Sequence, residues 1–87
     1  MFTQEVTVTN QVGLYARPAT FFIQKANEFK STILVQKEDV SVNAKSLLGI
    51  LSLGITKDTT IVLTADGEDA QEAVTALVNL VTSNLNE

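Results

Sequence analysis

The chain has 87 residues, of which 45% are hydrophobic and 18% charged, a composition typical of one globular domain with a modest core. Its net charge of −4 disfavours binding to nucleic acid or to an anionic membrane surface. The absence of cysteine and histidine excludes a disulfide framework, thiol catalysis and a zinc site, so no metal or other cofactor is expected.

Alternating and helical patterns organise the first third of the chain. Apolar and polar residues alternate over residues 2–9, which predicts a half-buried strand. Apolar residues at helical spacing then predict a helix from Ala16 to about Phe29, while Thr20 and Phe21 lie off its buried stripe, nearer to solvent. The stripe consists of Ala19, Phe22, Ile23, Ala26 and Phe29.

The middle of the chain predicts a hairpin followed by a short helix. Residues 32–37 are rich in β-branched types and read as a strand, Glu38-Asp39 forms a polar turn, and residues 40–43 return as a second strand. A brief apolar helix is predicted from Ser46 to about Ser52, with Ser46 as its N-cap.

The last part of the chain predicts a strand and a helix. Residues 60–65 form the strand, and acidic residues at 68–72 favour the start of a helix because they complement its dipole. Lys37 and the acidic run from Asp66 to Asp69 are assigned to turns and helix starts, with no further task. The order βαββαβα, with hairpin-type connections, indicates an α+β domain with helices over one face of an antiparallel sheet.

A candidate anion site begins with the glycine turn at Gly13. Pro18 suits the first turn of a helix, and a helix that starts near Ala16 would direct its free N–H groups toward Tyr15 and Arg17. Arg17 adds a fixed positive charge with a geometry that matches phosphate. From these residues alone, an ordinary helix start with a solvated arginine is the simpler interpretation.

Ser46 and the leucines after it form a second candidate site. Ser46 can be a plain helix cap or a phosphorylation site, and the two roles are compatible because a phosphate there would lie at the positive end of the helix. A short helix cannot bury all of its apolar residues, so we expect Leu47, Leu48 and Leu51 at the surface as a partner site. Lys45, like Arg17, lies next to a predicted helix start, which favours contact with a phosphate or an acidic partner.

Two motifs in this order resemble those of HPr, the phosphocarrier of the bacterial sugar phosphotransferase system: Gly13-Leu14-Tyr15-Ala16-Arg17-Pro18-Ala19-Thr20 and Asn43-Ala44-Lys45-Ser46-Leu47-Leu48-Gly49-Ile50-Leu51-Ser52-Leu53-Gly54. The resemblance extends essentially from end to end, so residues 1–87 are expected to form a single HPr-like domain. It implies an open-faced β-sandwich with a four-stranded antiparallel sheet and three helices on one face.

One position departs from the HPr pattern. Tyr15 occupies the place of the histidine that carries the phosphoryl group, and a phenol cannot present the nitrogen nucleophile that imidazole offers near neutral pH. No catalytic residue is therefore assigned. The chain looks closest in type to the catabolite-repression HPr-like proteins, which lack that histidine but keep the regulatory serine.

This resemblance implies a regulatory protein that is not an enzyme. HPr kinase/phosphorylase would phosphorylate Ser46, and the product would bind a transcription regulator of the catabolite control protein A type as its corepressor in carbon catabolite repression. Enzyme I of the phosphotransferase system would be a non-productive partner. The partner-binding residues implied are Arg17, Thr20, Lys45, Ser46, Leu47, Leu48 and Leu51.

Alternatives remain open at this stage. The chain can be a phosphocarrier HPr whose histidine is replaced by Tyr15, naturally or by engineering, or one that uses the tyrosine itself. It can also be an HPr-fold binding module with an unrelated partner. No segment approaches the roughly 18–20 apolar residues of a membrane span, and the first residues do not resemble a signal peptide. We expect a cytoplasmic protein that contacts neither DNA nor a membrane.

Overall fold

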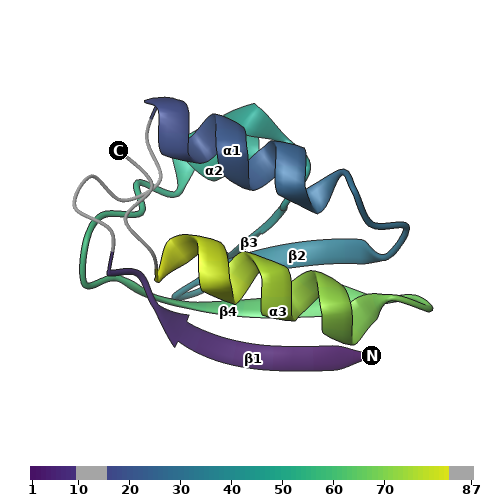
Figure 1. Ribbon diagram of the computed structural model, residues 1–87. Coiled ribbons are helices and arrows are strands. Elements are labelled where there is room, and N and C mark those ends of the chain that lie inside the picture. The colour runs from purple at the N-terminus through teal and green to yellow at the C-terminus, as the bar shows by residue number, and fades with distance from the viewer. Residues whose placement is uncertain (10–15, 83–87) are drawn as a thin grey trace.

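The computed structural model describes residues 1–9 and 16–82, and for residues 16 and 17 only the backbone. Within these ranges the chain forms an antiparallel sheet with strand order β1-β4-β2-β3 and three helices (Figure 1). The elements are β1 (Phe2–Thr7), α1 (Ala16–Ala26), β2 (Thr32–Lys37), β3 (Val40–Asn43), α2 (Leu47–Ser52), β4 (Thr60–Asp66) and α3 (Ala70–Val81). The predicted order βαββαβα and the α+β class are confirmed.

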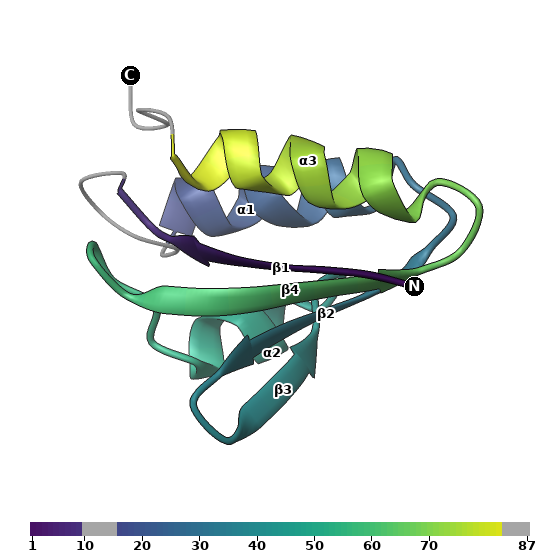
Figure 2. The ribbon, with the colours of Figure 1, turned by 90° about the horizontal axis from the view of Figure 1, so that it is seen from below.

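The core lies between one face of the sheet and the helices. Alternate side chains of β2 and β4 are buried: Ile33, Val35, Ile61, Leu63 and Ala65. Helices α1 and α3 lie side by side along this face (Figures 1 and 2). Helix α2 covers the same face beside β3, because Val42 is paired with the inward-facing Val35 and approaches Gly49 of α2. None of the helices in the described ranges is long and apolar enough to cross a membrane.

Helix α1 is three residues shorter than its apolar pattern predicts. The side chain of Asn27 donates a hydrogen bond to the carbonyl oxygen of Ile23, and Glu28 and Phe29 donate their N–H groups to carbonyls three residues back. Such bonds tighten and end the last turn of a helix. Phe29 therefore follows the helix rather than ending it, although its side chain still packs against the core.

The start of α3 is tied to the loop that precedes β2. The Asp69 carboxylate accepts hydrogen bonds from the N–H groups of Lys30 (2.9 Å) and Ser31 (3.0 Å) and from the Ser31 hydroxyl. Gly67 permits this approach, because a Cβ there would lie 2.5 Å from the Ser31 hydroxyl oxygen. The assignment of Asp69 to helix-start chemistry alone was wrong, since its side chain makes no cap bond to α3.

These hydrogen bonds make the stability of the fold depend on pH. The bond from the Ser31 hydroxyl, with those from the two backbone N–H groups, holds the pKa of Asp69 below its ordinary value. The charged carboxylate therefore stabilises the fold fully above the pKa of about 4 that aspartate has in the unfolded chain. This contribution is lost as the pH falls through the lowered folded value.

We expect Asp69→Asn to melt at a lower temperature than the unchanged chain at about pH 7, with a difference that narrows below about pH 4. Thermal melts across this pH range measure the difference. Ser31→Ala is the comparison, since it removes the hydroxyl and keeps the two backbone donors. Its melting temperature at about pH 7 should fall less than that of Asp69→Asn. A difference between Asp69→Asn and the unchanged chain that stays constant with pH would contradict the assignment.

Candidate functional site

Ser46 is the N-cap of α2, as the sequence predicts. Its backbone is extended (φ −107°, ψ 117°), and its hydroxyl oxygen accepts a hydrogen bond from the N–H of Gly49 at 3.2 Å. The turn before it is fixed by Asn43, whose side-chain oxygen accepts from Lys45 N–H and whose carbonyl accepts from Ser46 N–H. This geometry leaves the Ser46 side chain at the surface, partly exposed.

Gly49 and Lys37 hold α2 in place. A Cβ on Gly49 would lie 3.1 Å from the Cβ of Val42, so the missing side chain lets α2 lie close against β3. At the other end of α2, the Lys37 ammonium donates to the carbonyl oxygens of Leu53 (2.9 Å) and Gly54 (3.3 Å). A cation at these carbonyls complements the helix dipole.

Sequence reasoning missed both of these residues. Glycine inside a helical pattern often has a packing reason, and that signal could have drawn attention to Gly49. Lys37 was given no task beyond the hairpin turn, which was wrong, because its ammonium reaches residues 16 and 17 positions further along. No pattern among neighbouring residues in the sequence indicates a contact between residues 16 or 17 positions apart.

The leucines of α2 divide between solvent and core. Leu48 is 81% exposed and Leu47 45% exposed, as expected. Leu51 is only partly exposed, because one side of it packs against the core, so it contributes less to the surface than expected. It lies between Ile50 and Leu53, which both enter the core and draw this end of the helix inward. The exposed apolar surface of α2 is therefore the pair Leu47 and Leu48.

Lys45 makes a contact within the fold. Its ammonium donates to the carbonyl oxygen of Phe29 at 2.8 Å, and the residue is half-buried. This bond joins the segment before α2 to the loop after α1. A contact with a phosphate on Ser46 would have to use the remaining N–H groups of the ammonium.

The predicted anion site falls largely outside the described residues. Tyr15 is not among them, and the side chains of Ala16 and Arg17 are not described. Helix α1 does begin at Ala16, and it lies in contact with α2. Thr20 is exposed, as expected.

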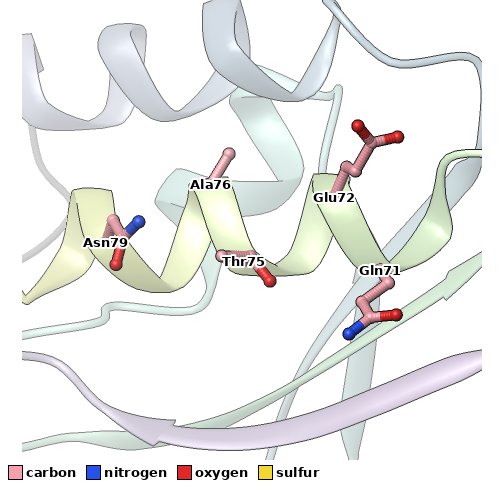
Figure 3. A pocket seen from close by; sticks show the side chains of 5 residues that line it. All are labelled: Gln71, Glu72, Thr75, Ala76 and Asn79. Carbon is pink, nitrogen blue, oxygen red and sulfur yellow. The ribbon is translucent and has the colours of Figure 1, made fainter.

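A hollow on the outer face of α3 lies away from these residues (Figure 3). The residues that line it are Gln71, Glu72, Thr75, Ala76 and Asn79. All of them come from one helix, so no second element directs polar groups into the hollow. It resembles an ordinary helix surface, and we assign it no function.

Comparison with known proteins decides the family. The family described as the PTS HPr component phosphorylation site matches residues 2–83. The chain belongs to the HPr family. The resemblance stated from the two sequence motifs is therefore confirmed.

HPr relatives of two kinds are similar to nearly the whole chain. The HPr-like protein Crh of Halalkalibacterium halodurans is 44% identical over 81 residues, covering 93% of this chain and 96% of that protein. The phosphocarrier protein HPr of Neisseria meningitidis serogroup A is 40% identical over 87 residues, covering 100% and 98%. The crystal structure of HPr-C-His from Thermoanaerobacter tengcongensis matches with a TM-score of 0.95 at 44% identity, covering 100% and 98%. Overall similarity thus supports an HPr phosphocarrier or a Crh-like protein.

A carboxylate should have very different effects on the free energy of unfolding at two positions of α2 that lie two residues apart. Leu48→Asp should change the free energy of unfolding by no more than about 0.5 kcal/mol, because the side chain is in solvent. Ile50→Asp should cost more than about 4 kcal/mol, because Ile50 is fully buried and the new carboxylate would have no partner. Thermal or urea unfolding of both variants measures this. A large loss for Leu48→Asp would mean that this side chain belongs to the core.

Proposed function

We propose that this HPr-family protein is a cytoplasmic regulator without enzymatic activity, phosphorylated on Ser46 by HPr kinase/phosphorylase. The observation that carries the proposal is that the chain contains no histidine and has Tyr15 at the family's carrier position. Without an imidazole, the labile phosphoramidate of a carrier cannot form. The regulatory-serine motif around Ser46 is intact.

The geometry around Ser46 supports its modification. In the reaction, the Ser46 hydroxyl oxygen attacks the γ-phosphorus of ATP, a new O–P bond forms, the bond to ADP breaks, and a base of the kinase takes the hydroxyl proton. The hydroxyl is partly exposed and accepts a bond from Gly49 N–H. A phosphate of charge about −2 would be held there beside backbone donors at a helix start, without refolding of the domain.

The phosphorylated protein would then act as corepressor of a transcription regulator of the catabolite control protein A type, in carbon catabolite repression. Leu47 and Leu48 supply an exposed apolar surface next to Ser46, which suits a protein partner. The phosphate would add a charged contact to this surface. Arg17, Thr20, Lys45 and Leu51 complete the proposed contact residues.

A phosphocarrier is the second candidate, favoured by the 40% identity to the phosphocarrier HPr of Neisseria meningitidis over the whole chain. In that case Tyr15 replaces the carrier histidine, naturally or by engineering. Enzyme I of the phosphotransferase system would then bind the chain without transferring a phosphoryl group to it.

Transfer from enzyme I tests whether the unchanged chain can act as a phosphoryl carrier, and Tyr15→His tests whether the rest of the site still supports transfer. We expect the unchanged chain to take no phosphoryl group from phosphoenolpyruvate and enzyme I, because it has no imidazole. The Tyr15→His variant should gain transfer, since Gly13, Arg17 and Pro18 are present to frame the site. Mass spectrometry under conditions that preserve acid-labile phosphate measures the product. Efficient labelling of the unchanged chain would defeat the regulatory proposal.

The regulatory proposal is tested by phosphorylation and binding together. Treatment with HPr kinase/phosphorylase and ATP should add one phosphate, and Ser46→Ala should accept none. The phosphorylated form should bind a catabolite control protein A-type regulator more tightly than the unmodified form. This gain should shrink at high salt because solvent-accessible charge pairs are screened. Leu48→Asp should weaken binding at every salt concentration.

Titrations of both forms against the regulator over a salt series measure these effects. If phosphorylation leaves the affinity unchanged at low salt, Ser46 is only a helix cap in this protein.

A further inference from the structure

Gly49 stands at an unusual place for a glycine. It lies inside the six-residue helix α2, where glycine is less favourable than alanine, so a packing or functional reason is expected. Its N–H donates to the Ser46 hydroxyl oxygen at 3.2 Å, and a Cβ built on it would lie 3.4 Å from that same oxygen. Gly49 thus both donates its N–H to the Ser46 hydroxyl oxygen and places no side chain beside that oxygen.

The unmodified fold could accommodate a Cβ at position 49 with only a small shift of its neighbours. A Cβ at 3.4 Å would be in ordinary van der Waals contact with the Ser46 hydroxyl oxygen. Toward β3 the fit is tighter, 3.1 Å from the Cβ of Val42, and would need a shift of a few tenths of an ångström. Alanine's higher helix propensity offsets part of that disturbance. The space beside the hydroxyl matters more once further atoms must be attached to the oxygen.

We propose that Gly49 is a positioning residue for the phosphorylation of Ser46. Its N–H donates to the Ser46 hydroxyl oxygen and holds that oxygen in position, and its missing side chain leaves space beside the oxygen for the incoming phosphoryl group. The inference rests on the proposed function, because it assumes that Ser46 is the acceptor. It adds the residue that makes this serine a usable acceptor as well as a helix cap.

Ser52 provides a matched control on the same helix. Its hydroxyl donates to the carbonyl oxygen of Gly49 at 2.7 Å, and its side chain is exposed. Ser52→Ala therefore disturbs α2 and its hydrogen bonding but places no new atom beside Ser46. A comparison of Ser52→Ala with Gly49→Ala separates an effect at the hydroxyl from the loss of a hydrogen bond within the helix, and thermal melts report any strain that the new Cβ places on Val42.

The experiment measures kcat and KM of HPr kinase/phosphorylase, with ATP, for the full unchanged chain, Gly49→Ala and Ser52→Ala. Thermal melts of all three proteins fix an assay temperature at which each is fully folded. We expect Gly49→Ala to lower kcat by roughly tenfold or more, because a small misplacement of the nucleophile has a large effect on rate. KM should stay within about twofold, since the docking surface is unchanged. Ser52→Ala should match the unchanged chain in both constants.

The outcomes distinguish this inference from the proposed function. If the unchanged chain is not phosphorylated, the proposed function fails and the inference falls with it. If the unchanged chain is phosphorylated and Gly49→Ala keeps its kcat, the inference alone is overturned. An equal loss of kcat in Ser52→Ala, or a rise in KM with no change in kcat, overturns it as well, because either result assigns the effect to the helix or to docking.

Discussion

Helix α2 is too short to be stable in isolation, because helices below about 12–15 residues are marginal in water. Its order depends on groups outside its six residues. The Ser46 hydroxyl closes its first turn, the Lys37 ammonium binds the carbonyls at its far end, and the missing side chain of Gly49 lets it lie against β3. Lys37 is the last residue of β2, so the β2–β3 hairpin both flanks this helix and fastens it.

Such anchoring explains how one short helix can serve the core and the surface together. Ile50 is fully buried while Leu48, two residues earlier, is mostly in solvent. A helix free to rotate would hide the apolar surface or lose its buried contacts. With both ends held, the leucine pair Leu47 and Leu48 and the Ser46 hydroxyl keep fixed positions relative to each other. A change of charge at Ser46 can therefore alter the surface of the domain while its packing stays the same.

Local patterns predicted much of this fold, and their failures have a common cause. The bounds of β2 and β3 and the capping role of Ser46 follow from neighbouring residues, and the structure has them as predicted. The contacts of Lys37 and Asp69 join residues 16 to 39 positions apart, so they depend on the order of strands in the sheet. The partial burial of Leu51 could not be predicted, because exposure on a six-residue helix depends on how each end packs against the core. Tyr15 lies outside the described residues, so its expected role stays a prediction.

The loop between α1 and β2 has a consequence for cooperativity. The Phe29 carbonyl accepts a hydrogen bond from the Lys45 ammonium in the segment before α2, while the N–H groups of Lys30 and Ser31 donate to the Asp69 carboxylate at the start of α3. Three consecutive residues thus join the end of one helix to the beginnings of two others. Loosening this loop would release both connections at once, so the helix ends that meet there should open as one cooperative unit rather than fray separately.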